Sequence, residues 1–524
     1  GCQNTLTRGF SKNKSHTPVN LVFLKLQASK PQNSSVDLPG VRGLSSHSVR
    51  AATDHWHRMS QGRFVFSPSA LRSLERDKEL LEREQSQRRL AAPAVTSYFL
   101  RKEVREKSIA WSHGSPQRPA LICKDLVVQN ALYTGDLEAL RQLFPKGAPV
   151  NLVIQPEGGD MIWVNKGGLW SLAYEQELTT PLHITAGRGF TECLRLLLLR
   201  GANVDLAPGG TTALHEACEE CQGECAKLLL SYGANANAVN EDGLMPLHVC
   251  TELESIECAK HLLQFGAAVN GRSLEEDDSP LHVACRHGLP DHVSLYLRYG
   301  AHLEHHNDEG KSPLNAACSQ PQEKATLGRY YQVCQQLVDA GAKVGTEDLQ
   351  HQTPLHMSCK NVNPDVVDLM LKNGAHVNDM CYGGNAPMHN VLKEVAYKPE
   401  HEPERVVQAL LNYGSIRVWP GALPQVLKYC CTSPRVIEVL LNAYDRLKIT
   451  EAWVEAVPPE VFKQHQGFYE SVFALTQTPR SLQHLARFKL RNYLEGRLTK
   501  VVPKLDLPNF LKKYLLLDFR DYVH

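Results

Sequence analysis

The sequence predicts an all-α solenoid of about eight stacked helix-turn-helix repeats with hairpin loops, followed by a small helical box. Three observations support this fold class. A short motif of the type TTPLH or SPLH occurs seven times, its copies recur about every 33 residues, and a glycine follows each copy where a second helix would end. One such helix pair cannot bury its own apolar face, so the units are expected to stack on one another.

Composition and charge exclude several function classes. The 524 residues are 42% hydrophobic and 22% charged, which is typical of a globular chain with a large core. Lys plus Arg number 57 against 56 for Asp plus Glu, so no global field draws the chain to nucleic acid or anionic lipid. No stretch reaches the roughly 18 uninterrupted apolar residues of a membrane helix. We therefore expect no nucleic-acid partner and no membrane association.

The cysteines indicate a reducing compartment. There are fifteen, an odd number, and we recognise no secretory signal. Such usage favours free thiols, and we expect a cytoplasmic protein, with the nucleus as the alternative compartment.

The N-terminal region divides into two predicted segments. Residues 1–58 are rich in Ser, Asn and Gln and show no sustained period, so we predict a disordered or non-native upstream segment, with the functional chain beginning at Met59. Residues 59–120 are predicted to be a helical and linker region. Between 62 and 92 the pattern is Ser-capped and laced with charges, which favours a solvated helix over a partner-binding one.

The repeats are predicted to occupy residues 121–420, and each begins in the same way. The opening residue usually offers an N-cap hydroxyl, and the proline after it sits where a helix needs no amide donor. The next leucine is expected to face the neighbouring repeat, and the second helix to end at a left-handed glycine. The opening residues are Thr180, Thr212, Met245, Ser279, Ser312, Thr353 and Ala386, and the glycines are Gly201, Gly233, Gly266, Gly300, Gly341, Gly374 and Gly414.

The spacing identifies the repeat type. Successive opening residues are 32, 33, 34, 33, 41 and 33 residues apart, and this period with the T-P-L-H-x-A pattern resembles the ankyrin repeat. A degenerate first repeat is predicted at 126–151 as the N-terminal cap. Two insertions break the period: one at 152–178 carries Trp163, Trp170 and Tyr174, and the other lies around QPQEKATLGRYYQ. Such excursions either contact a partner or pack as an aromatic flap on the first repeat.

Two sets of residues resemble metal sites. Six motif histidines recur, but equivalent positions in stacked helices lie roughly 8 to 10 Å apart, too far to share one ion. Asn315 takes the same place in one repeat, so we interpret the set as structural hydrogen bonders: His183, His215, His248, His282, His356 and His389.

Three cysteines form the second set. Cys218, Cys221 and Cys225 resemble a zinc or iron–sulfur motif, but Cys218 and Cys225 recur in phase with cysteines of other repeats. We interpret these two as small core hydrophobes, and only Cys221 is out of phase with the repeats. No phosphate-binding loop, nucleophile elbow or metalloprotease signature occurs. We therefore predict no catalytic residue, no metal and no cofactor.

The C-terminal residues carry a second motif. Residues 421–476 are predicted to be a helical connector and residues 477–524 the final box. From Pro479 the chain reads PRSLQHLARFKLRNYLEGRL, with apolar and basic residues at helical spacing, then VVPKLDLPNFLKKYLLLDF, a proline-broken helix. Taken alone, the first segment is explained by a last helix packed on the solenoid.

The two segments together resemble a SOCS box, and the chain from Phe64 to His524 is similar to the ankyrin repeat and SOCS box family. The resemblance implies that Leu482 inserts into a pocket of elongin C. The implied elongin C contacts are Leu482, Leu485, Ala486 and Leu490, with Ala486 standing where the family usually has Cys. The implied cullin contacts are Leu507, Pro508, Leu511, Tyr514 and Leu515, with Phe510 in place of a second family proline.

The resemblance implies a substrate-recognition subunit of an elongin B/C–cullin-5–RING ubiquitin ligase. The repeats would bind an unknown protein target through hairpin tips and the inner helix face, where the candidate residues are Arg188, Glu219, Glu220, Arg286 and His287. One alternative is a non-catalytic ankyrin scaffold or inhibitor that recruits no ligase. A thiol or metal enzyme is the other, and the cysteine phase disfavours it.

Overall fold

The computed structural model describes residues 121–154, 161–166, 169–174, 178–476 and 480–518. The predictions for residues 1–58 and 59–120 lie outside these ranges. The chain divides into two units, Gly1–Arg63 and Phe64–His524, and every described helix and strand belongs to the second unit.

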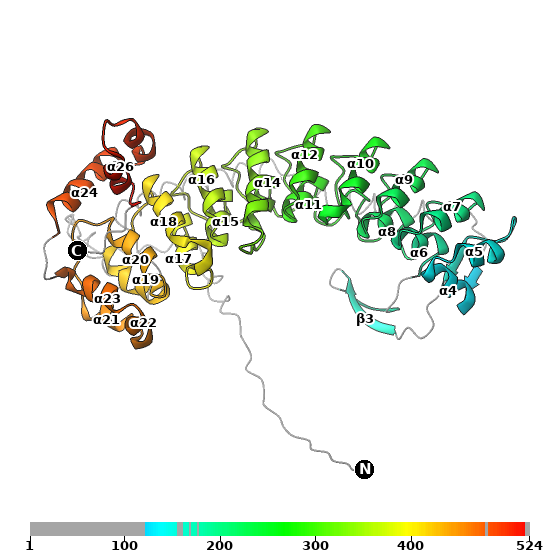
Figure 1. Cartoon of the computed structure of the whole chain (residues 1–524), viewed down its shortest axis with the longest axis horizontal. Helices are drawn as coiled ribbons and strands as arrows, with labels where there is room; N and C mark the ends of the chain where they lie inside the picture. Colours follow the sequence, from blue (N-terminus) through cyan, green and yellow to red (C-terminus); the bar gives the residue numbers. More distant parts are fainter. Residues whose placement is uncertain (1–120, 155–160, 167–168, 175–177, 477–479, 519–524) are drawn as a thin grey trace, which may run out of the picture. The chain divides into compact units, whose positions relative to one another are not determined.

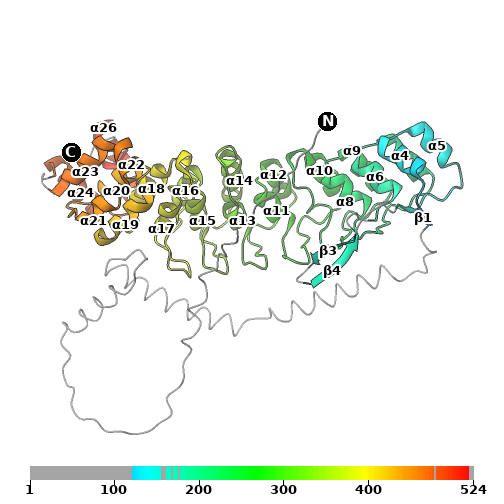
Figure 2. The ribbon, with the colours of Figure 1, turned by 90° about the horizontal axis from the view of Figure 1, so that it is seen from below.

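Pairs of antiparallel helices build the solenoid, and consecutive pairs stack in two layers. First helices of neighbouring repeats lie side by side in one layer and second helices in the other (Figure 1), and Figure 2 shows the same row turned by 90°. The pairs are α4 (Leu126–Thr134) with α5 (Leu137–Leu143), α6 (Pro181–Gly187) with α7 (Thr191–Leu199), α8 (Ala213–Glu219) with α9 (Gly223–Ser231), α11 (Pro280–Arg286) with α12 (Pro290–Arg298), α13 (Pro313–Ser319) with α14 (Leu327–Asp339), α15 (Pro354–Asn361) with α16 (Pro364–Lys372), and α17 (Pro387–Glu394) with α18 (Pro403–Asn412).

The core follows the predicted pattern. The motif leucines are at most 4% exposed and pack between neighbouring repeats: Leu182, Leu214, Leu247, Leu281, Leu314 and Leu355. All seven predicted terminal glycines have positive φ, between 80° and 101°, which is the left-handed conformation expected after a helix.

In five repeats the motif histidine ties the repeat to the next. In four repeats its Nδ1 lies 2.7–2.9 Å from the N-cap hydroxyl. In five repeats its Nε2 lies 2.8–3.1 Å from a backbone carbonyl just before the following motif. Asn315 makes the equivalent link by donating to the carbonyls of Thr346 and Gln352, at 3.2 and 3.3 Å. The structural interpretation is therefore confirmed for these five histidines.

One repeat departs from the predicted pattern. After Met245 the chain forms only a turn before η1 (Leu253–Ser255) and α10 (Ile256–Gln264), so this repeat lacks its first helix. The β-branched Thr251 disfavours helical conformation here, whereas the missing hydroxyl at Met245 is not decisive, because Ala386 also lacks one and α17 follows it. His248 nevertheless keeps its inter-repeat bond to the carbonyl of Asp278, at 3.0 Å.

Short strands are the departure from an all-α fold. β1 (Leu121–Cys123) pairs in parallel with β2 (Leu152–Ile154), beside the first repeat. The insertion at 152–178 continues as an antiparallel hairpin of β3 (Met161–Lys166) and β4 (Leu169–Tyr174), in which Trp163 pairs with Leu172 and Asn165 with Trp170. The second insertion lengthens α14, which has 13 residues where α12 and α16 have 9.

Helices after the last motif extend the stack and then form the box. α19 (Leu423–Cys430), preceded by η3 (Pro420–Ala422), packs on α17, and α20 (Pro434–Leu441) packs on α18, as another repeat would. The remaining elements are η2 (Pro399–His401), α21 (Glu451–Glu455), α22 (Pro459–Gln464), α23 (Gln466–Phe473), η4 (Ala474–Thr476), α24 (Leu482–Leu494), α25 (Leu498–Val501), η5 (Val502–Lys504) and α26 (Asn509–Leu515).

Candidate interaction surfaces

Helix α24 turns its apolar residues outward. It begins at the N-cap Ser481, whose hydroxyl accepts the amide of His484 at 3.2 Å. Leu482 is 86% exposed, Leu490 47% and Tyr493 77%, while Ala486 is exposed and Leu485 half-buried. Because residues at spacings of four and three share one side of a helix, these side chains make a continuous apolar strip. We call this strip, Leu482, Ala486, Leu490 and Tyr493, the outer face of α24.

The opposite side of α24 is polar and buried. His484, Arg487 and Arg491 are 3%, 2% and 8% exposed, and they face the end of the solenoid through hydrogen bonds to α18 and to the loop after α20. A surface helix normally buries its apolar side, so this arrangement is inverted. An exposed apolar strip on such a helix is a sign of a protein-binding surface.

The predicted cullin contacts divide into accessible and buried residues. Pro508 is exposed, and Leu507 and Leu511 are half-buried. Tyr514 and Leu515 are 6% and 5% exposed. Leu515 forms a small core with two other residues of the box, Leu498 and Val502.

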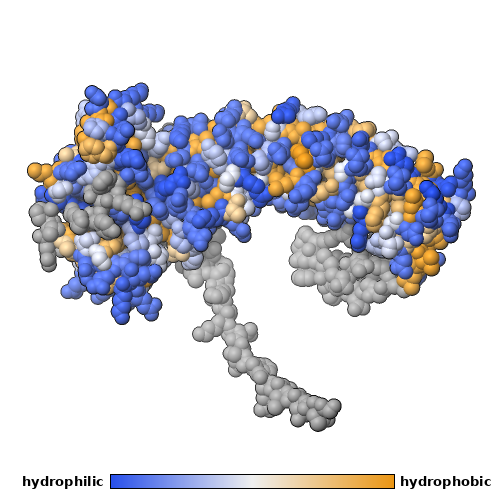
Figure 3. All heavy atoms as spheres, in the orientation of Figure 1, coloured by the Kyte–Doolittle hydropathy of each residue, from blue (hydrophilic) through white to orange (hydrophobic). Residues whose placement is uncertain are grey.

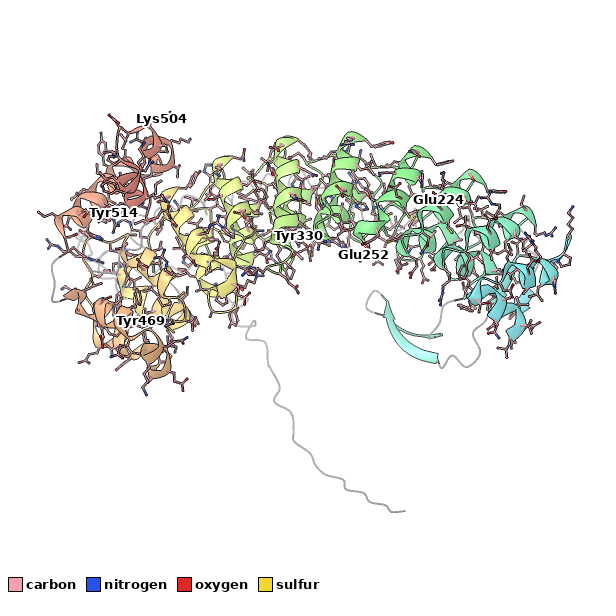
Figure 4. All side chains as sticks on the ribbon, viewed as in Figure 1. Glu224, Glu252, Tyr330, Tyr469, Lys504 and Tyr514 are labelled. Atoms are coloured by element: carbon pink, nitrogen blue, oxygen red, sulfur yellow. The ribbon has the colours of Figure 1, made fainter. Side chains whose placement is uncertain are left out.

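Tyr514 lies on the side of the box toward the solenoid, whereas Lys504 lies at its far end (Figure 4). The Arg487 guanidinium stacks over the Tyr514 ring at 4.1 Å. The side chains of Tyr514 and Leu515 therefore pack within the C-terminal box.

Two exposed aromatic residues were not among the sequence candidates. Tyr493 continues the outer face of α24, eleven residues after Leu482 and three after Leu490, and this spacing could have identified it. Phe510 is 60% exposed at the start of α26. Hydrophobic residues accordingly gather on the surface of the C-terminal box (Figure 3).

The candidate target-binding residues lie at equivalent places in three repeats. They sit at the C-terminal ends of the first helices: Arg188 after α6, Glu219 and Glu220 at the end of α8, and Arg286 and His287 at the end of α11. Four of them are exposed, and Arg286 is half-buried. The repeat without a first helix separates the α8 pair from the α11 pair.

Two of these arginines already have partners within the chain. Arg188 lies over the ring of Tyr133, 5.5 Å from its centroid. Arg286 donates to Glu276 at 2.9 Å and to Asp278. Burial raises the pKa of Asp278 to about 6, against the opposing effect of the Arg286 charge.

The second insertion, which extends into α14, contributes a residue to this surface. The Tyr330 hydroxyl donates to the carbonyl of Arg286 at 2.8 Å, so α14 is fastened to the end of α11, and Tyr330 and Glu252 both lie along the lower edge of the repeats in Figure 4. From the sequence, Tyr330 could be placed only within an insertion. Its hydrogen bond to Arg286 depends on how α14 packs against α11, which the repeat pattern does not predict.

The cysteines behave as core residues. Cys218, Cys285 and Cys359 are fully buried, and Cys225 is nearly so. Cys221 is half-buried, and burial raises its pKa to about 11, which keeps the thiol protonated and unreactive at neutral pH. Within the described ranges no group of three His, Cys, Asp or Glu side chains is placed to hold a metal ion. None of the described helices has the length and apolar character needed to cross a membrane.

Comparison with known proteins gives the same two modules. The chain matches the family described as "Ankyrin repeats (3 copies)" over residues 128–240, 247–348, 281–381 and 322–419. It matches the family described as "SOCS box" over residues 478–516.

Three curated relatives combine both modules. The chain is 38% identical to Ankyrin repeat and SOCS box protein 16 of Mus musculus over 454 residues, covering 87% of this chain and 97% of the relative. It is 42% identical to Ankyrin repeat and SOCS box protein 18 of Homo sapiens, covering 74% and 85%. It is 49% identical to Ankyrin repeat and SOCS box protein 10 of Homo sapiens, covering 68% and 77%.

Proposed function

We propose that this chain, which belongs to the ankyrin repeat and SOCS box family, is the substrate-recognition subunit of an elongin B/C–cullin-5–RING ubiquitin ligase. The observation that carries the proposal is the outer face of α24, an apolar strip exposed on a helix that is fastened to the solenoid by its polar side. In this proposal residues 121–420 bind the target, residues 421–476 connect the solenoid to the box, and residues 477–524 recruit the ligase.

Elongin C is the proposed occupant of the outer face of α24. Leu482, exposed at the first position of the helix, would enter a pocket of elongin C, with Leu485, Ala486 and Leu490 beside it. Burying one leucine contributes about 2 kcal/mol, and a few such anchors usually dominate an interface. Ala486 offers less contact area than the family's usual cysteine, so Leu482 and Leu490 carry more of the contact here.

Cullin-5 is the proposed partner of the segment that leads into α26. Leu507, Pro508 and Leu511 are accessible for this contact, and Phe510 adds an exposed ring. Tyr514 and Leu515, buried in the box, would act by holding α26 in place.

The chain itself would make and break no bond. A RING protein recruited by cullin-5, with its E2, would supply the transfer of ubiquitin. The repeats would hold the target so that its lysines lie near the charged E2, which raises their effective concentration. Because the described cysteines are free, we propose the cytoplasm, or alternatively the nucleus, as its compartment.

Titration calorimetry with purified elongin B/C tests the proposal. We expect tight one-to-one binding to residues 59–524, weakened by 1 kcal/mol or more in Leu482→Ala. Leu199→Ala is the matched control, because Leu199 is also exposed, at 68%, but lies on α7 of the solenoid. Circular dichroism would establish that each variant is folded. Absence of binding by the folded wild-type chain would reject the ligase role and leave a scaffold or inhibitor.

A further inference from the structure

The buried side of α24 meets the C-terminal ends of other helices. Arg491 donates from one nitrogen to the Asn412 side chain at 2.8 Å and to the carbonyl of Leu515 at 2.6 Å, and from the other to the carbonyl of Leu411 at 3.2 Å. Leu411 and Asn412 end α18 of the solenoid, and Leu515 ends α26 of the box. One guanidinium therefore bridges the two modules.

A second pair of side chains repeats this arrangement at α20. Arg487 donates to the Asn442 side chain at 3.1 Å, and Asn442 is the C-cap of α20. His484 Nε2 lies 2.7 Å from the carbonyl of Tyr444, two residues further on. The buried side of α24 is thus attached to the ends of two solenoid helices, α18 and α20.

The solenoid returns hydrogen bonds to the box. Gln408 and Asn412, both on α18, donate to the carbonyl of Leu516 at 3.0 and 2.8 Å. Arg417 donates to the carbonyl of Ala443 at 2.8 Å and to the side chain of Asn492 on α24. Asn412 is therefore both an acceptor for Arg491 and a donor to the end of α26.

Electrostatics favours arginines at this junction. The C-terminal end of a helix carries a partial negative charge and unsatisfied carbonyls, and the ends of α18, α20 and α26 converge on α24. The three acceptors of Arg491 named above are all neutral, so burial and the nearby Arg487 and Arg417 lower its pKa to about 9. Arg491 remains protonated at pH 7, which keeps all its donors available.

Hydrogen bonds constrain a joint more tightly than apolar contact does. An apolar interface tolerates sliding, because burial is non-directional, whereas a guanidinium fork must keep its distances and angles to several acceptors at once. A polar joint therefore suits a helix whose direction matters more than its contribution to stability.

We infer that Arg491 and Arg487 are positioning residues that set the angle between the target-binding solenoid and the ligase-binding box. The inference rests on the proposed function for its purpose, since a fixed angle holds the target at one place relative to the E2. The two arginines need not touch elongin C, because they lie on the side of α24 opposite its outer face.

Pulsed electron paramagnetic resonance on the full chain measures the angle as a distance distribution. Spin labels attached through p-acetylphenylalanine at Lys372, an exposed residue of α16, and at Lys504 in the box avoid the native cysteines. We expect Arg491→Ala and the milder Arg491→Lys, which keeps the charge but lacks the planar guanidinium fork, to at least double the width of this distribution. Elongin B/C affinity should change by less than threefold.

Arg497→Ala is the matched control. Arg497 is exposed, and its guanidinium donates only within the box, to the carbonyl of Leu494 at 3.4 Å, so its removal should leave the width unchanged. Asn412→Leu, which breaks the same joint from the solenoid side, should broaden the distribution as Arg491→Ala does.

Unchanged widths in folded Arg491→Lys and Asn412→Leu would overturn the inference. Broadening together with a more than threefold loss of elongin affinity would also overturn it, because α24 itself would then be disturbed. If the wild-type chain bound no elongin, the proposed function would fail, while the distance distributions would still test the joint.

Discussion

Cys221 shows how one residue can depart from its repeat pattern. It has φ 59° at the turn between α8 and α9, where the corresponding turns of two other repeats have Gly189 and Gly288 with φ 75° and 64°. A left-handed residue with a Cβ is strained by roughly 1–2 kcal/mol relative to its usual conformations. The out-of-phase cysteine of the sequence is thus a strained turn residue.

Replacing Cys221 by glycine should therefore stabilise the protein. We expect Cys221→Gly to raise the free energy of unfolding by about 1 kcal/mol, measured by urea denaturation followed by circular dichroism. Cys221→Ala keeps the Cβ and its strain, so it should leave the midpoint nearly unchanged. Equal effects of the two variants would locate the change in the thiol and not in the backbone.

Several first helices contain a buried motif histidine whose neutral form is favoured. In α15, burial lowers the pKa of His356 to about 4, although its bond to the Asn385 carbonyl opposes the shift. Burial likewise lowers the pKa of His215 to about 4. Because the folded pKa lies below the unfolded value near 6.5, this contribution to stability is complete above pH 6.5 and is lost as pH falls toward 4.

Lowering the pH should accordingly reduce the free energy of unfolding of the repeats, and His356→Asn should make this reduction smaller. Each such histidine can lower the free energy of unfolding by up to about 1.4 kcal/mol per pH unit below 6.5. We expect His356→Asn, which copies the native Asn315, to lose less stability than wild type between pH 7 and 5 in urea denaturation. His306→Asn, at an exposed position, should behave as wild type, and a parallel pH response in both variants would contradict the mechanism.

The elements show which predictions a repeat pattern supports. Helix starts after Thr180, Ser279, Ser312 and Thr353 are confirmed, because capping hydroxyls and prolines act locally. The predicted helix after Met245 is wrong, although the motif there keeps its proline, leucine and histidine; the missing hydroxyl does not by itself explain this, because Ala386 also lacks one and α17 follows it. The sequence did not predict the conformation of the two insertions, because no other repeat contains an equivalent segment.

For the whole molecule, nearest-neighbour contacts determine how damage spreads. Each repeat contacts only adjacent repeats, so stability is close to a sum of repeat and interface contributions. Leu281 is fully buried on α11 near the middle of the stack. A cavity at Leu281 weakens the contacts between the repeat that contains α11 and its two neighbours, and it leaves distant repeats intact.

Leu281→Ala should therefore divide the unfolding transition. We expect the free energy of unfolding to fall by about 2–5 kcal/mol. In hydrogen exchange, α11 and its neighbours should open earlier than α18 to α20. Leu199→Ala, on the exposed side of α7, should change neither the free energy of unfolding nor the order in which the helices exchange. A uniform increase in exchange along the solenoid would show instead that the repeats unfold as one unit.

The sequence by itself determined the repeat period, the capped first helices, the buried leucines and the two family modules, because each depends on local chemistry written in every copy. Tertiary structure decided which side of α24 faces outward. Its leucines and arginines share one helix, so helical spacing alone fits a helix packed on the solenoid by its apolar residues. The carbonyls that end α18 and α26, which bind Arg491, and the Asn442 side chain that caps α20, which binds Arg487, reverse that choice and leave Leu482 and Leu490 in solvent. Those acceptors come from segments that only the folded chain brings together.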